Sequence, residues 1–138
     1  MAEVTIRPIT YDDTEDIIRW RNSDFVRSRF IDQTLFTKES HEKWLKNFVE
    51  TGKVAQFIIL FNEKSVGSVY LRDIDYDKKS AEYGIFIGEE SARGNGVGTK
   101  SAALILQYAF EELKLEKIFL RVYKDNTGAV KSYIKAGF

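Results

Sequence analysis

The chain has 138 residues and a mass of 16.0 kDa, a length that suits one domain and is too short for two. Hydrophobic residues make up 43% of the sequence and charged residues 30%, which predicts a folded protein rather than a disordered one. The 21 basic residues balance the 21 acidic ones, so the chain lacks the surplus of positive charge that a general nucleic-acid binder needs.

The residue types that are missing exclude several kinds of chemistry. The sequence has no cysteine, which rules out disulfides, thiolate nucleophiles and cysteine-based metal sites. His41 is the only histidine, so a histidine-rich site is excluded as well and we expect no metal. The opening residues MAEVTIRPIT do not resemble a signal peptide, and no apolar run approaches the roughly 18 residues of a membrane span. We therefore expect a cytoplasmic protein with no membrane partner.

The first part of the chain predicts a strand and two helices. Residues 4–7 alternate in polarity, and the adjacent Pro8 confines this strand to a sheet edge or to its own end. Thr10 or Asp12 can cap the first helix, and the second helix is expected to begin after Thr37. The residues expected to be buried are Ile17, Ile18 and Trp20 in the first helix and Trp44, Leu45, Phe48 and Val49 in the second. The segment 22–36 is predicted to be irregular, and either shapes a binding cleft or only connects the helices.

From residue 54 the hydrophobic period changes to two, which predicts strands. Residues 54–61 and 65–73 are expected to form a hairpin. After a turn at 75–78, residues 81–87 add a third strand. These three segments predict an antiparallel meander.

A loop over 88–95 then leads into a long helix, 96–113. Its apolar residues should lie against the sheet: Val97, Leu104, Ile105, Leu106, Ala109 and Phe110. A strand over 117–122 follows, predicted to be parallel to the preceding strand, and a last helix spans 127–136. The order β-α-α-β-β-β-α-β-α predicts one α+β domain over residues 1–138, a central sheet with helices on both faces.

The most informative segment runs from Arg93 to Thr99, between a strand and a long helix. Its glycines let backbone N–H groups crowd toward an anion, and the helix N-terminus adds partial positive charge, so the segment predicts a pyrophosphate cradle. A Walker loop does not fit, because Thr99 separates Gly98 from Lys100. A Rossmann fingerprint does not fit either, because Thr99 stands where its third glycine belongs. The pattern Arg/Gln-x-x-Gly-x-Gly/Ala is met by Arg93, Gly96 and Gly98.

This pattern resembles that of the GCN5-related N-acetyltransferases (GNAT), and the resemblance covers essentially the whole chain. It implies the GNAT fold, with acetyl-CoA as cosubstrate. In that family the loop wraps the pyrophosphate of coenzyme A, and the preceding strand offers backbone groups to the pantetheine arm. The residues that the resemblance assigns to the cosubstrate are Ile85, Phe86, Ile87, Arg93, Gly94, Asn95, Gly96, Val97, Gly98 and Thr99.

A second match lies near the end of the chain. The residues Asn126, Ala129, Tyr133, Gly137 and Phe138 repeat the family pattern N-x-x-A-x-x-x-Y-x-x-x-G-F at its spacing. The resemblance implies that Asn126 binds near the pantetheine and that Tyr133 protonates the departing thiolate. Either motif alone is weak, because short glycine patterns and buried tyrosines are common. Together and in the right order they are specific.

Acetyl transfer to an amine needs an oxyanion donor, an acid for sulfur and a route for the amine proton. A backbone N–H of residues 85–87 is the expected oxyanion donor. Two candidates remain for the base. Glu82 stands on the strand where several family members carry a catalytic glutamate, but it could equally be a solvated strand residue. His41 has a suitable pKa, near 6.5 when unperturbed, but could equally be structural.

The acceptor is expected to be a primary amine on a small molecule. The stretches 20–22, 26–30 and 41–44 resemble those of acetyltransferases that modify a UDP-linked 4-amino sugar on the way to pseudaminic acid. That resemblance implies that Arg29, Phe30 and Trp44 contact the nucleotide sugar. Aromatic faces can stack on uracil, and arginine can pair with a diphosphate. Trp20 is expected in the core, whereas Phe30 and Trp44 could be core or contact residues.

Two alternatives stay open. One is N-terminal acetylation of a ribosomal or other protein, by the related branch that shares the Trp20-Arg21-Asn22 opening. The other is a coenzyme A-binding module without activity. The sequence also stops directly after Phe138, where the family continues into a last strand. We therefore expect either a truncated chain or a strand supplied by another chain, with a homodimer favoured.

Overall fold

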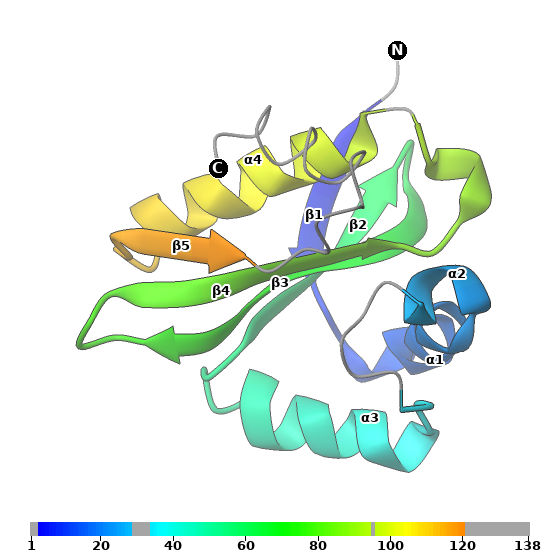
Figure 1. Ribbon diagram of the computed structural model, residues 1–138, viewed down its shortest axis with the longest axis horizontal. Helices are drawn as coiled ribbons and strands as arrows, with labels where there is room; N and C mark the ends of the chain where they lie inside the picture. Colours follow the sequence, from blue (N-terminus) through cyan, green and yellow to red (C-terminus); the bar gives the residue numbers. More distant parts are fainter. Residues whose placement is uncertain (1–2, 29–33, 95, 121–138) are drawn as a thin grey trace.

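The computed structural model describes residues 3–28, 34–94 and 96–120 (Figure 1). Its five strands form one sheet in the order β1-β2-β3-β4-β5. The strands are β1 (Val4–Pro8), β2 (Ala55–Phe61), β3 (Lys64–Asp75), β4 (Ser80–Ile87) and β5 (Lys117–Leu120). Neighbours from β1 to β4 are antiparallel, whereas β5 runs parallel to β4. The meander, the parallel strand and the edge position of Pro8 are confirmed.

Helices cover both faces of this sheet (Figure 1). The helices α1 (Thr14–Asn22), α2 (Asp24–Arg27) and α3 (Lys38–Trp44) lie on one face, and α4 (Val97–Glu111) lies on the other. This arrangement confirms the predicted α+β fold, although the predicted last helix lies outside the described residues. None of the helices in the described ranges has the length and hydropathy needed to span a membrane.

Strand alternation divides the core between the two faces. On β2, Ile58 and Ile59 are both fully buried but belong to different hydrophobic clusters, because successive side chains of a strand point to opposite faces. Ile59 packs in the cluster that includes Ile105 of α4. Ile58 packs in the cluster that includes Ile17 and Trp20 of α1. The expectation that Trp20 is a core residue is therefore confirmed, with 1% of its surface exposed.

The helix starts follow the predicted caps. Thr10 precedes a 3₁₀ turn, Tyr11–Asp13, that leads into α1, and its backbone N–H donates to the Asp13 carboxylate at 2.9 Å. Thr37 caps α3, because its hydroxyl accepts from the Ser40 N–H at 3.1 Å. The alternative cap, Asp12, is not used.

Three local expectations were wrong. Phe48 was expected on the buried side of its helix but is 40% exposed, because α3 ends at Trp44 and continues as a π-helical turn, Leu45–Val49. The Glu50 N–H donates to the Leu45 carbonyl five residues earlier and closes this wider turn. The extra residue in the turn changes the direction in which the following side chains point. Phe110 was expected against the sheet but is 45% exposed. The stretch 22–36, predicted to be irregular, contains the short helix α2.

Candidate active site

The segment before α4 has the backbone of an anion cradle. Gly94 and Gly96 have φ angles of +80° and +74°, which glycine adopts without strain. A β-carbon on either residue would meet no atom within 4 Å, so the space in front of the loop is open. Gly96 immediately precedes α4, whose first turn carries no acidic side chain. The first-turn N–H groups and the positive end of the helix therefore face this space, which suits an anionic group such as a pyrophosphate.

Arg93, the first residue of the loop motif, is bonded to the protein backbone. Its Nε donates to the Ile87 carbonyl at 3.1 Å, and its Nη2 donates to the Gly88 carbonyl at 3.2 Å. Its guanidinium carbon lies 3.3 Å from the centroid of the Phe25 ring on α2. Arg93 thus joins the cradle to the end of β4 and to α2.

A second set of contacts holds the same segment to α1. The Glu89 carboxylate accepts from Arg19 Nη2 at 2.6 Å and from the Trp20 indole N–H at 2.8 Å. These two hydrogen bonds, with that of Arg19 foremost, lower the pKa of Glu89 and keep it ionised. The loop between β4 and α4 is therefore held to α1 through Glu89 and to α2 through Arg93.

The next two residues of α1 fix the segment that leads to α3. The Arg21 guanidinium lies 4.4 Å from the centroid of the Phe36 ring and 5.8 Å from that of Phe86 on β4. Asn22 donates to the Phe36 carbonyl at 2.8 Å and accepts from the Phe36 N–H at 2.6 Å. The Trp20-Arg21-Asn22 stretch therefore organises the helical face of the site through three different contacts.

Residues 85–87, predicted to contact the pantetheine arm, lie in the second half of β4. On one side they pair with β3, where Ile85 faces Val69 and Ile87 faces Gly67. On the other side, the described pairing with β5 extends from Ser80 to Tyr83. A pantetheine contact by residues 85–87 stays a prediction.

Glu82 lies in a row of side chains that crosses the sheet on the face of α3. Its register partners are Arg72 on β3 and Phe119 on β5. Phe119 is 50% exposed and Glu82 is half-buried. Glu82 therefore stands at a partly open position between a cation and an aromatic ring.

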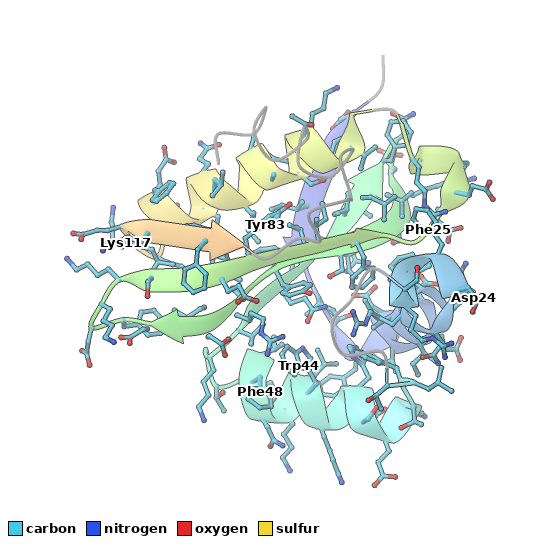
Figure 2. All side chains as sticks on the ribbon, viewed as in Figure 1. Asp24, Phe25, Trp44, Phe48, Tyr83 and Lys117 are labelled. Carbon is cyan, nitrogen blue, oxygen red and sulfur yellow. The ribbon has the colours of Figure 1, made fainter. Side chains whose placement is uncertain are left out.

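Trp44 reaches toward this row from α3 (Figure 2). Its indole N–H donates to the Gln56 side chain at 2.9 Å, and its ring centroid lies 4.8 Å from that of Phe48. The Arg72 guanidinium carbon lies 5.9 Å from the centroid of the Trp44 ring. Trp44 is half-buried, so the structure gives it both a packing role and an accessible edge.

His41, the other candidate base, lies in the interior. It is 1% exposed, and neither ring nitrogen has a hydrogen-bond partner among the described residues. Burial lowers its pKa to about 4, which the nearby Asp13 carboxylate only partly opposes. A base must reach the amine it deprotonates, so these surroundings favour a structural role for His41.

Five predicted site residues lie outside the described ranges: Arg29, Phe30, Asn95, Asn126 and Tyr133. Sequence analysis also missed three residues that contact the site, namely Phe25, Arg72 and Glu89. The strand pairing gave no clear signal for Arg72, because a regular hairpin places Asp73 opposite Glu82 and the register shift between Arg72 and Asp75 brings Arg72 there instead. Phe25 and Glu89 carry no motif that could have singled them out.

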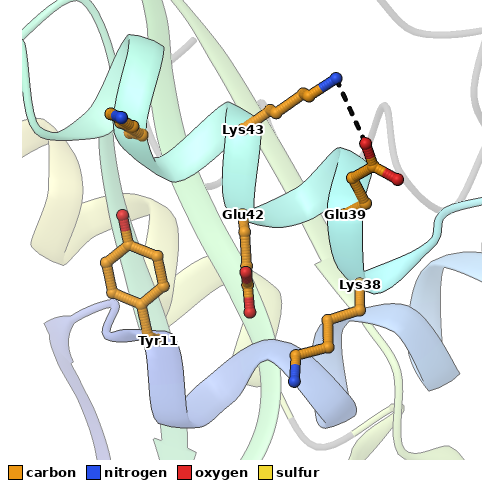
Figure 3. A pocket seen from close by; sticks show the side chains of 6 residues that line it. Tyr11, Lys38, Glu39, Glu42 and Lys43 are labelled. Carbon is orange, nitrogen blue, oxygen red and sulfur yellow. Dashed lines mark ion pairs between the residues drawn. The ribbon is translucent and has the colours of Figure 1, made fainter.

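A shallow hollow of about 490 Å³ lies beside α3, away from the cradle (Figure 3). Its lining residues are Tyr11, Lys38, Glu39, Glu42, Lys43 and Lys46. Lys43 and Glu39 form an ion pair along α3 at 3.5 Å. None of the predicted site residues that the structure describes lines this hollow. In the described part of the chain, no group of three or more His, Asp or Glu side chains could hold a metal ion.

Comparison with known proteins agrees with this geometry. The family model of the acetyltransferase (GNAT) domain matches residues 3–138. The acetyltransferase PseH of Campylobacter jejuni is 30% identical over 125 residues, which cover 86% of this chain and 72% of that protein. The spermidine N(1)-acetyltransferase of Escherichia coli is 26% identical over 135 residues, covering 98% of this chain and 72% of the relative.

Solved structures show the same relationship. The crystal structure of the spermidine N-acetyltransferase of Vibrio cholerae, in complex with CoA and spermine, matches with a TM-score of 0.89 and 25% identity. The match covers 97% of this chain and 79% of that one. A dodecameric structure of the same enzyme matches with a TM-score of 0.81 and 25% identity, over 98% of this chain and 78% of that one. The chain therefore belongs to the GNAT acetyltransferases and is an acetyl-CoA-dependent N-acetyltransferase.

Proposed function

We propose that the acceptor is the primary amine of a nucleotide-linked amino sugar, which attacks the acetyl thioester directly. The observation that supports this proposal most is the group formed by Trp44, Phe48 and Arg72. The centroids of the two rings lie 4.8 Å apart with their planes tilted by 32°, and the guanidinium lies 5.9 Å from the Trp44 centroid. An accessible aromatic pair beside a guanidinium suits a uracil ring followed by a diphosphate.

The charges of the described site favour this acceptor over a polyamine. A polyamine carries several positive charges and needs carboxylates that are not already matched by cations. Glu89 is held by Arg19, and Glu82 has Arg72 as its neighbour on β3. Among the described contacts of the Trp44 ring, the charged partner is the Arg72 guanidinium, which suits an anionic nucleotide sugar.

The proposed chemistry assigns one task to each group. Glu82 accepts the proton of the acceptor ammonium, directly or through water, so that the amine can attack the acetyl carbonyl. A backbone N–H of residues 85–87 donates to the developing oxyanion. Tyr133, whose unperturbed pKa is roughly 10, is protonated at neutral pH and donates its proton to the departing thiolate.

Binding is assigned to two further groups of residues. The cosubstrate residues are Ile85, Phe86, Ile87, Arg93, Gly94, Asn95, Gly96, Val97, Gly98, Thr99 and Asn126. Arg29, Phe30 and Trp44 contact the nucleotide sugar. The single domain over residues 1–138, the cytoplasmic location and the homodimer also stay proposals, and light scattering tests the last of them.

The acceptor is tested by comparing initial rates of CoA release with three amines. These are a UDP-linked 4-amino sugar, spermidine and a peptide with a free N-terminus. We expect the nucleotide sugar to give the highest kcat/KM, and Trp44→Ala to raise its KM about tenfold while leaving the KM of acetyl-CoA unchanged. Phe110→Ala, which removes an exposed ring from α4, is the matched control. A higher kcat/KM for spermidine would refute the nucleotide sugar as the acceptor.

The acid is tested separately with Tyr133→Phe. We expect kcat to fall at least about a hundredfold, as is typical when a general acid is lost, while the affinity for acetyl-CoA stays the same. An unchanged kcat would remove Tyr133 from the mechanism. A loss of acetyl-CoA affinity would instead assign it to binding.

A further inference from the structure

Phe25 is a site neighbour that no motif predicts. It lies on α2, is 39% exposed, and places the centroid of its ring 3.3 Å from the guanidinium carbon of Arg93 (Figure 2). At this distance the cation lies on the face of the ring, where the ring quadrupole attracts it. Apolar ring surface in contact with water is unfavourable, and the guanidinium covers one face of this ring.

The other side of the contact is the end of β4. The Arg93 side chain donates to the carbonyls of Ile87 and Gly88, at 3.1 and 3.2 Å. Two donors of one planar guanidinium thus hold two successive carbonyl groups. The orientation of these peptide groups depends on where the guanidinium lies, and Phe25 fixes one face of it.

These carbonyls stand between the two halves of the cosubstrate site. The strand residues 85–87 end at these carbonyls, and the cradle at Gly94 and Gly96 follows Arg93 by one to three residues. A guanidinium that bridges them sets the distance between the strand and the cradle. A ligand that spans both, as acetyl-CoA does, is bound tightly only when this distance is already correct.

We propose that Phe25 is a positioning residue for acetyl-CoA, which acts by holding Arg93 against the carbonyls of Ile87 and Gly88. Arg93, which the loop motif places among the cosubstrate residues, then contributes to binding through its hydrogen bonds to the backbone and not by contacting the pyrophosphate itself. Phe25 belongs to the helices on the face of Trp44, so α2 links that face to the cosubstrate loop. The proposal does not depend on which amine is the acceptor.

The test is a double-mutant cycle on the affinity for acetyl-CoA, measured by calorimetry with Phe25→Leu, Arg93→Gln and the double variant. Leucine keeps an apolar side chain at the position but removes the π face. We expect Phe25→Leu to weaken binding about three- to tenfold, the range of one cation–π contact. The double variant should bind as Arg93→Gln does, because Phe25 acts through Arg93.

Two further measurements separate positioning from general damage. Phe25→Tyr keeps the ring and should restore the wild-type affinity, and Phe110→Leu, at a ring of similar exposure on α4, should have no effect. Arg93→Lys keeps the positive charge but lacks the planar fork that holds two carbonyl groups, so it should weaken acetyl-CoA binding about as much as Arg93→Gln does.

Three outcomes would overturn the proposal. Additive losses in the cycle would show that Phe25 does not act through Arg93. Wild-type affinity in Arg93→Lys would show that the positive charge matters and that the hydrogen bonds to the two carbonyls do not. Wild-type affinity in Phe25→Leu, with the fold confirmed by thermal unfolding, would show that the ring is not needed.

Discussion

Gly88 and Trp20 are in such close contact that a β-carbon on Gly88 would overlap the indole ring. Gly88 directly follows β4, and Trp20 is a fully buried residue of α1. The same indole donates its N–H to Glu89, the next residue of the loop. Trp20 therefore fixes the chain as it leaves the sheet toward the cradle, by shape at one residue and by a hydrogen bond at the next.

Replacing Gly88 with alanine should destabilise the protein. The added methyl group has to displace a buried indole, and such overpacking costs about 1–3 kcal/mol. Urea unfolding followed by tryptophan fluorescence measures the change. Gly94→Ala is the comparison, because nothing lies within 4 Å of its β-carbon and only its positive φ opposes the change. A larger loss for Gly94→Ala than for Gly88→Ala would contradict the packing argument.

A negative charge at Gly96 should abolish much of the affinity for acetyl-CoA. Gly96→Asp places a carboxylate before the first turn of α4, where it repels the pyrophosphate and fills the open space. We expect at least about a tenfold higher Kd by calorimetry, or about 1.4 kcal/mol. Gly52→Asp is the matched control, because Gly52 also has a positive φ, of +80°, but lies in the turn before β2. Equal losses of acetyl-CoA affinity in the two variants would show that the substitution acts by disturbing the fold and not by placing a charge at the cradle.

Loss of the Glu89 charge should loosen the link between α1 and the cosubstrate loop. Glu89→Gln keeps an acceptor for the Trp20 indole but removes the ion pair with the largely exposed Arg19. We expect unfolding to become easier by about 1 kcal/mol, the upper range for an exposed pair, together with weaker acetyl-CoA binding. The adjacent exposed Glu90 supplies the control, Glu90→Gln. The same loss in both would mean that only total charge matters.

The stability of the protein should depend on pH through His41. Its pKa is about 4 in the folded chain because it is buried, and near 6.5 when unfolded. Between these values only the unfolded chain binds the proton, so the free energy of unfolding falls as pH drops from 6.5 to 4. The full loss is about 3 kcal/mol, and no contribution remains above pH 7.

Urea unfolding across this pH range tests that dependence. His41→Phe replaces the imidazole by a ring that does not titrate and that can pack against Phe36, whose ring centroid lies 6.4 Å away. We expect a flatter profile for the variant between pH 4 and 6.5, whatever its stability at pH 7. Parallel profiles for the two proteins would assign the acid sensitivity to carboxylates instead.

The parts of the fold that follow local rules could be predicted from the sequence. Helical turns begin after Thr10 and Thr37. At Thr37 the side-chain hydroxyl completes the first turn, and at Thr10 the backbone N–H does so by donating to Asp13. Pro8 lies on an edge strand because it has no N–H to donate. The glycine-rich segment was predicted to lie between a strand and a long helix, and it does so, with positive φ angles at Gly94 and Gly96.

The errors came from features that depend on tertiary packing. Helical periodicity placed Phe110 toward the sheet. The side of α4 that packs against the sheet includes small buried residues such as Ser101 and Ala102, and Phe110 lies outside that side. The contact between Phe25 and Arg93 joins residues 68 positions apart, which neither period nor motif encodes. Arg72 and Glu82 face each other only after a register shift between Arg72 and Asp75, where Asp73 adopts a positive φ.

The π-helical turn at Leu45–Val49 gives the chain one residue more than a regular helix would hold between Trp44 and β2. Each helical residue advances the side-chain direction by about 100°, given 3.6 residues per turn. Deleting Asn47 would therefore restore the regular period and rotate Trp44 relative to everything that follows it. Given the acceptor contact proposed for Trp44, acceptor preference would then change through the gain or loss of a single codon, without any substitution of a contact residue.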